Sequence, residues 1–127
     1  MAKIVKYRAG GAVTKNTFVK LSSGKTATQT SATATDTIGV QLNTTTTDGD
    51  IAYVCVEGEC EVTAGEAVVA GEYIRPGASG FAEGADATGN VICGLYLGHE
   101  VNGTAETVTT PDLITVHLKL DKTRLLA

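Results

Sequence analysis

The chain has 127 residues and a formal net charge of −4, with 15 glycines, 3 cysteines and no tryptophan. This length corresponds to one domain, and no apolar run reaches the roughly 18 residues of a membrane-spanning helix. An odd number of cysteines without zinc-type CxxC spacing argues against a disulfide framework or a structural zinc site.

The first third of the chain contains two predicted strands and one weak segment. Residues 3–8 mix apolar and basic side chains, and Gly10-Gly11 ends this strand in a hinge or a tight turn. Residues 12–21 form a second strand that contains several apolar residues. Residues 25–37 consist largely of Thr, Ala and Ser, and their lack of bulk predicts a weakly anchored edge strand or a loop.

The middle of the chain is a series of short apolar strands separated by turn signals. Residues 38–42 are one such strand, and Asp48-Gly49 is the turn in the polar loop that follows. From residue 51 to residue 98, β-branched runs alternate with glycines, which is typical of a barrel or sandwich of antiparallel strands. Pro76 ends one of these strands, because proline cannot donate a hydrogen bond to the ladder.

The C-terminal part contains a hairpin signal and one clear strand. Asn102-Gly103 is the signature of a tight hairpin, and residues 113–120 alternate polar and apolar side chains, as in a half-covered sheet. The sequence therefore predicts an all-β fold, a small barrel or sandwich of short antiparallel strands with an extended N-terminal arm. The expected parts are an N-terminal arm (1–11), a single barrel-like domain (12–120) and a C-terminal tail (121–127).

The three cysteines are expected to be structural. No signal-peptide pattern begins the chain, so we expect synthesis in a reducing cytosol. Cys55, Cys60 and Cys93 are then predicted to be buried, reduced thiols that act as small hydrophobic side chains. The alternative is that Glu57-Gly58 forms a two-residue hairpin turn that brings Cys55 and Cys60 face to face.

Basic residues gather at the two ends of the chain and acidic residues in its body. Every charged residue before Thr26 is basic, and Arg75 is the single basic residue from Thr26 to Leu118. Basic residues return at Lys119 and beyond. This polarity either orients the chain on an acidic partner surface or pairs neighbouring copies. The alternative is that the terminal lysines merely solvate frayed ends.

No arrangement of residues predicts catalysis, and we expect no catalytic, cofactor-binding or metal-binding residues. His99 and His117 lie on different predicted strands, and neither has a nucleophile or an orienting carboxylate in reach. Glu57, Glu59 and Glu61 share one strand face, which an exposed acidic surface explains better than a calcium site. Nucleic-acid binding is not expected, because the body is acidic and its aromatic residues are not interleaved with lysines.

The order of the segments resembles the capsid cement (head decoration) proteins of tailed phages. The resemblance covers most of residues 1–98. It begins with the N-terminal strand and continues through the "TFVKL" strand, the Thr/Ala-rich segment ending at Ile38 and the strand "DIAYVCVEGECEVTA". Gly71 and Tyr73, within "GEAVVAGEYIRPGASGFAEGAD", fall at a turn that the family shares, and "GNVICGLYLG" closes the module. Residues 104–127 extend past the usual end of the family.

The resemblance implies a homotrimer on the exterior of an expanded capsid, bound to the major capsid protein, which braces the shell against internal DNA pressure. Such a protein is made in the host cytoplasm and ends in the virion, without contact to nucleic acid or membrane. We predict that the N-terminal strand binds the shell by adding to a neighbouring sheet, through Lys3, Ile4, Val5, Lys6, Tyr7 and Arg8. The tail is predicted to dock on a neighbour, unless it is only a frayed end, through Lys122, Arg124, Leu125 and Leu126.

Two other functions fit parts of the pattern. "GEAVVAGE" resembles the half-motif of a lipoyl- or biotinyl-carrier barrel, but that fold displays a modified lysine at a hairpin tip. No lysine occurs between Thr26 and Leu118, which argues against this function. Another β-rich virion component, such as a tail-tube or spike subunit, is the closer alternative, since those proteins also use Gly/Thr-rich strands and trimerise.

Overall fold

The computed structural model describes residues 2–22, 26–29, 37–66, 68, 71–77, 80–84, 91–96, 100–101, 104–105, 113–119 and 124–125. The extended elements in this part of the chain are all strands, and besides them it contains only turns, bends, isolated bridges and a 3₁₀ residue at Gly80, so the prediction of an all-β fold is confirmed. No helix long and apolar enough to cross a membrane was found among these residues.

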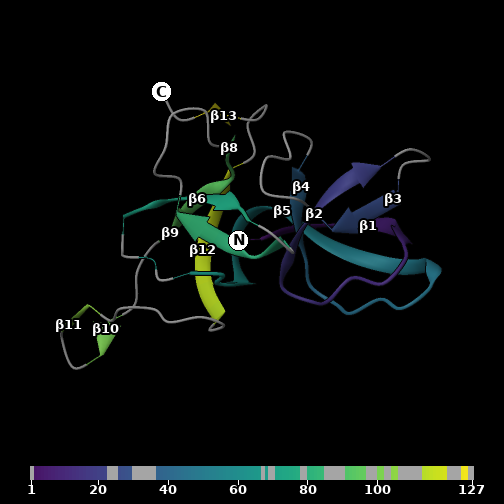
Figure 1. Ribbon diagram of the computed structural model, residues 1–127, viewed down its shortest axis with the longest axis horizontal. Helices are drawn as coiled ribbons and strands as arrows, with labels where there is room; N and C mark the ends of the chain where they lie inside the picture. The colour runs from purple at the N-terminus through teal and green to yellow at the C-terminus, as the bar shows by residue number, and fades with distance from the viewer. Residues whose placement is uncertain are drawn as a thin grey trace.

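Five strands close into a small barrel, seen at the right of Figure 1. They are β1 (Lys3–Gly10), β2 (Thr17–Ser22), β3 (Thr26–Gln29), β4 (Thr37–Gln41) and the first part of β5 (Asp48–Thr63). The order around the barrel is β1-β3-β2-β4-β5, and an antiparallel pairing of β5 with β1 closes the ring. A ring of this kind leaves few free sheet edges.

The long strand β5 leaves the barrel and continues into a second sheet, at the left of Figure 1. This sheet adds β12 (Leu113–Lys119), β9 (Gly94–Tyr96), β6 (Tyr73–Pro76) and β7 (Ala82–Gly84), in that order. A parallel bridge between Ala64 and Ala82 brings β7 back to the end of β5. Both halves of the molecule are therefore built on one shared strand.

Two short strand pairs complete the described elements. Strand β10 (Glu100–Val101) pairs with β11 (Thr104–Ala105) across the predicted Asn-Gly turn. Strand β8 (Val91–Ile92) pairs with β13 (Arg124–Leu125). The turn predicted at residues 102–103 lies outside the described residues, but the strands on either side of it pair antiparallel, as the prediction of a hairpin requires.

The barrel wall carries apolar side chains on both faces, and each face belongs to a different core. Val19 and Val54 are fully buried inside the barrel, whereas their neighbours Phe18 and Cys55 are fully buried in a larger core shared with the second sheet. Successive strand residues point to opposite faces, so the runs of consecutive apolar residues serve two cores at once. The larger core consists of Phe18, Val40, Cys55, Cys60, Val62, Ala64, Val68, Ile74, Ala82, Cys93, Tyr96, Ile114, Val116 and Leu118.

Near Gly58, the alternation of the β5 side chains that face the larger core is shifted by one residue. Against β1, Ile4 pairs with Cys55 but Lys3 pairs with Glu57, so β5 contains one extra residue at this point. Gly58 has a φ of 94°, which glycine adopts at little cost. Such a bulge bends a strand and shifts its alternation. Strand β5 is continuous here, and Glu57-Gly58 forms no hairpin turn.

Two expectations for the N-terminal region are wrong. The first strand was expected to have no partner in its own chain, but β1 pairs with β5 from Lys3 to Gly10. Residues 26–29 are neither a loop nor an edge, since β3 pairs with β2 on one side and with β1 on the other. The small side chains of this segment suit a narrow barrel, in which Ala27 is fully buried.

Candidate contact surface

The outer face of the β1–β5 pair combines basic and apolar side chains. Along β1, Ile4, Lys6 and Arg8 are exposed, and the residues between them are less so. The register places Lys6 opposite Tyr53 and Arg8 opposite Ile51 on β5. These five residues, Ile4, Lys6, Arg8, Ile51 and Tyr53, are called the basic face below.

Large apolar side chains on the basic face are well exposed. The exposed fractions are 52% for Ile4, 55% for Ile51 and 40% for Tyr53. The Lys6 ammonium lies 5.9 Å from the centre of the Tyr53 ring, within the range of a cation–π contact. Aromatic and basic residues at the centre of a patch are the kind that contribute most to protein–protein binding.

The cations of the basic face are held only loosely within the chain. Arg8 Nη2 lies 3.4 Å from Asp48 Oδ2, and both side chains are more than 60% exposed. An ion pair with this exposure contributes little to stability, because water screens it. A partner carboxylate can therefore replace Asp48 at small cost.

Strand β1 also presents part of a sheet edge. On the side away from β5, the pairings among the described residues involve only Arg8 and Ala9, which lie beside Thr26 and Ala27 of β3. The backbone of residues 3–7 on that side is a candidate site for an added strand. Exposed lysines beside such an edge also hinder its pairing with the sheet edge of another copy.

The predicted contact residues divide between the two sides of β1. Ile4, Lys6 and Arg8 form the basic face, and Lys3 is exposed opposite Glu57. Tyr7 packs against the barrel core, so it is not free to enter a partner's pocket. Val5 alternates with the outward residues and is half-buried.

Ile51 and Tyr53 were not among the residues predicted for contact with the shell. Both are apolar residues at alternate positions near the start of β5, but the sequence alone could not show that these positions lie on an exposed face. Of the predicted tail contacts, Arg124 and Leu125 form β13, while Lys122 and Leu126 lie outside the described residues.

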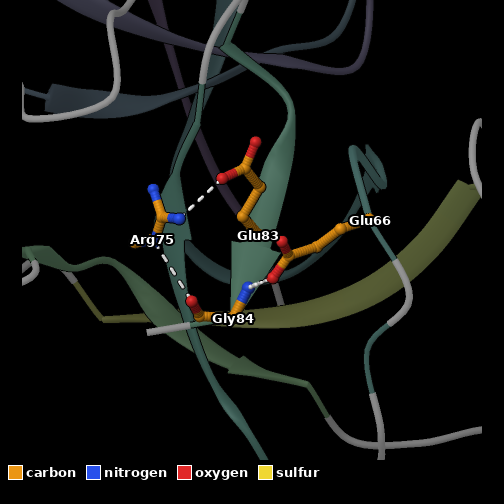
Figure 2. A network of polar contacts seen from close by, with 4 residues as sticks. All are labelled: Glu66, Arg75, Glu83 and Gly84. Atoms are coloured by element: carbon orange, nitrogen blue, oxygen red, sulfur yellow. Dashed lines mark hydrogen bonds and ion pairs between the residues drawn. The ribbon is translucent and has the colours of Figure 1, made fainter. Parts of the chain in front are cut away.

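A second polar cluster, shown in Figure 2, joins β6, β7 and the turn after β5. Arg75 Nη2 lies 2.7 Å from Glu83 Oε1, and Arg75 Nε donates to the Gly84 carbonyl at 3.1 Å. The Gly84 amide donates to Glu66 Oε2 at 2.9 Å. Arg75 and Glu83 are less than one-fifth exposed, so the cluster fastens the end of the second sheet rather than offering a free cation.

No catalytic arrangement was found among the described residues. His117 is exposed and lies directly opposite Glu59 on β5, so the sequence-based expectation that no carboxylate lies near this histidine is wrong. Glu57, Glu59 and Glu61 are all exposed, which agrees with an acidic strand face. The described part of the chain contains no group of three metal-ligating side chains. His99 lies outside the described residues.

The three cysteines are buried free thiols. Burial raises the pKa of Cys93 to about 12, although a hydrogen bond with Thr37 lowers it in part. Burial, and after it the nearby Cys55 thiol, raises the pKa of Cys60 well above its ordinary value. Protonated, buried thiols of this kind are unreactive at neutral pH.

No family model and no curated protein matches this sequence. Among solved structures, the chain is similar to the N base of the head fibre protein gp8.5 of bacteriophage phi29, known from a crystal structure. The two share 18% sequence identity with a TM-score of 0.70, over 94% of this chain and 96% of that one. At this identity the similarity establishes a common fold.

Proposed function

We propose that this chain is a structural protein of a phage virion that attaches to the outside of the head and acts by contact rather than catalysis. The observation that carries the proposal is the shared fold with a head-fibre base along almost the whole length of both chains. The resemblance of the segment order to head decoration proteins supports the same function, and it rests on the sequence alone.

The basic face is the proposed attachment surface. It combines three exposed apolar side chains with two exposed, weakly held cations that can form ion pairs with carboxylates of a partner. An acidic shell surface formed by the major capsid protein would complement this charge and speed association. Residues 3–7 can add main-chain hydrogen bonds if a strand of the shell lies along the open side of β1.

A binding assay with purified heads tests this proposal. The double variant Lys6→Glu/Arg8→Glu reverses two exposed charges without touching either core. We expect at least a tenfold loss of affinity for expanded, empty heads, because each reversed charge replaces attraction by repulsion. Deleting β1 is a poor test, since β1 is part of the barrel wall.

The matched control is Lys15→Glu, which reverses an exposed basic residue on the loop before β2. This variant should bind heads as the wild type does, apart from a small effect of net charge. Equal affinity of the wild type and the Lys6→Glu/Arg8→Glu variant would contradict the basic face as the attachment surface. Saturable binding of the wild type to tails and not to heads would favour a tail-tube or spike component.

The same proposal includes two further properties, namely that the chain is a homotrimer and that it braces the shell. A protein that clamps neighbouring capsid subunits should help DNA-filled heads to retain their genome on heating. We propose synthesis in the host cytoplasm and a final place on the capsid exterior, with the C-terminal tail as a second contact.

A further inference from the structure

The second sheet returns to its own first strand. The parallel bridge between Ala64 and Ala82 joins β7 to the end of β5, so β5, β12, β9, β6 and β7 form a second ring. Both alanines are fully buried and belong to the larger core. The barrel and this ring therefore share β5, and the junction between the end of β5 and β7 is called the seam below.

The seam contains little backbone pairing. The Gly65 amide donates to the Ala82 carbonyl at 2.8 Å, and within the described part of the chain Ala64–Ala82 is the only backbone bridge at the seam. Every other junction of the ring joins at least two pairs of residues in register. A junction with few hydrogen bonds opens at a lower free energy than the rest of a sheet.

Side chains replace the backbone at the next position along the seam. Ile74, which lies opposite Gly84, directs its carbonyl to the Cys93 amide and away from β7. In an antiparallel pair of this kind the backbone groups of both residues point away from each other, so those of Gly84 face outwards. There the Gly84 amide donates to Glu66 Oε2 at 2.9 Å, and its carbonyl accepts from Arg75 Nε at 3.1 Å (Figure 2).

We propose that the seam is the point at which the folded chain opens, and that Glu66 and Arg75 are the latch that holds it closed. The two side chains supply the acceptor and the donor that a longer backbone ladder would supply. Arg75 is held in turn by Glu83, with 2.7 Å between Nη2 and Oε1, and the burial of both side chains limits screening of this pair. The latch thus uses the single basic residue between Thr26 and Leu118.

Opening of the seam turns β7 into a free sheet edge. The Ala82 carbonyl and both backbone groups of Gly84 then lose their partners, and an unpaired edge of this kind pairs with strands of other molecules. A closed latch therefore keeps copies of the chain from joining through β7. This inference is independent of the proposed attachment to a phage head, which uses β1 at the other end of the strand order.

Native-state hydrogen exchange measured by NMR tests the opening amide by amide. Gly65 reports on the seam, and Leu42, whose amide donates to the Tyr53 carbonyl at 2.8 Å, reports on the barrel. After correction for intrinsic rates, we expect the wild-type Gly65 amide to exchange at least about tenfold faster than that of Leu42, because the seam opens without global unfolding. Glu66→Ala should speed exchange at Gly65 by a further factor of roughly ten, since a hydrogen bond to a charged group is lost.

Gly39→Ala is the control that separates local opening from global unfolding. An added Cβ at residue 39 would meet the Cys55 backbone in the barrel wall, so this variant weakens the barrel and leaves the seam intact. The open-seam state retains the barrel, so Gly39→Ala should speed exchange at Leu42 and not at Gly65. Equal acceleration of both amides would show that the seam opens only when the whole chain unfolds, and this would overturn the proposal.

Three further variants test the latch itself, each first shown to fold by its β-type circular dichroism. Arg75→Ala should speed exchange at Gly65 at least as much as Glu66→Ala does. Glu66→Gln keeps an oxygen that accepts from the Gly84 amide, so its effect should be only about threefold. Glu61→Ala removes the same charge from an exposed position on β5 and should match the wild type. The same exchange rate at Gly65 in Glu66→Ala as in Glu61→Ala would contradict the latch.

Discussion

Gly39 on β4 packs closely against the backbone of its neighbouring strand β5. A Cβ atom at this position would lie 2.1 Å from the Cys55 carbonyl oxygen and 2.9 Å from its carbon. Because both are backbone atoms of a central strand, they cannot move aside as a flexible side chain would. We expect Gly39→Ala to lower the free energy of unfolding by roughly 3 kcal/mol, measured by urea denaturation.

Gly49 is the matched control for Gly39. It also has a positive φ, of 99°, but nothing lies within 4 Å of a Cβ placed there. Gly49→Ala should therefore cost only the backbone strain, about 1 kcal/mol. If the two variants lose the same stability, close packing of β4 on β5 is not the reason for glycine at residue 39.

The Cys93 thiol should make the stability of the protein depend on alkaline pH. Its pKa rises from the ordinary 9.0 to about 12 on folding, so the unfolded chain loses this proton first as the pH increases. The contribution of Cys93 to stability is complete below pH 9 and falls as the pH rises towards 12, by up to roughly 1.4 kcal/mol per pH unit.

Comparison with Cys93→Ala isolates this effect from other groups that titrate at high pH. Between pH 7.5 and pH 10.5 the wild type should lose roughly 2 kcal/mol more stability than the variant. Urea denaturation at both pH values measures the difference. Parallel losses in the two proteins would show that the Cys93 thiol is not protected from ionisation in the fold.

Among the elements, β12 is central to the second sheet, where it lies between β5 and β9. Leu118 on this strand is fully buried, whereas Leu113 on the same strand is 52% exposed. Leu118→Asp would bury an unpaired carboxylate, and we expect it to lower stability by about 4 kcal/mol or more. Thermal unfolding followed by circular dichroism measures the change.

Leu113→Asp introduces the same charge on the outer face of the same strand. It should change stability by no more than about 0.5 kcal/mol. Loss of the fold in both variants would indicate that β12 tolerates no charge on either face, contrary to the half-covered sheet that its alternation predicts.

Local patterns predicted the strands well where the side chains alternate clearly or where a turn residue is specific. The predicted strand agrees with the structure over residues 113–119, the strand end at Pro76 agrees too, and the strands that flank the predicted Asn-Gly turn are paired. Local patterns carry no information on strand partners that are distant in the chain. The pairing of β1 with β5 joins residues from 38 (Gly10 and Asp48) to 54 (Lys3 and Glu57) positions apart, and it decides both the barrel closure and the composition of the basic face.

Two further features could not be predicted because they depend on the three-dimensional path of the chain. Segment 26–29 lacks bulky side chains, and only the narrow barrel makes Ala27 a suitable core residue. The shared position of Cys55 and Cys60 depends on the bulge before Gly58, whereas regular alternation would separate them. The sequence predicted a contact role for the basic and apolar residues of β1, but it did not show which of them face outwards.

At the scale of the whole molecule, five large apolar side chains in the described part of the chain are exposed, namely Ile4, Ile51, Tyr53, Tyr73 and Leu113. They occur on both halves of the molecule, so the basic face accounts for only three of them. Association of copies would bury the others, and obligate assemblies make folding depend on protein concentration. This supports the proposed homotrimer.

Sedimentation equilibrium at micromolar concentration tests this state in the absence of heads. We expect a species of three times the 13.0 kDa chain mass and a thermal midpoint that falls on dilution, because unfolding of an oligomer follows mass action. The Lys6→Glu/Arg8→Glu variant should remain a trimer, since the basic face is the surface proposed for contact with the shell and not for contact between copies. A single 13.0 kDa species, with a midpoint independent of concentration, would contradict a trimer formed before attachment and restrict assembly to the capsid surface.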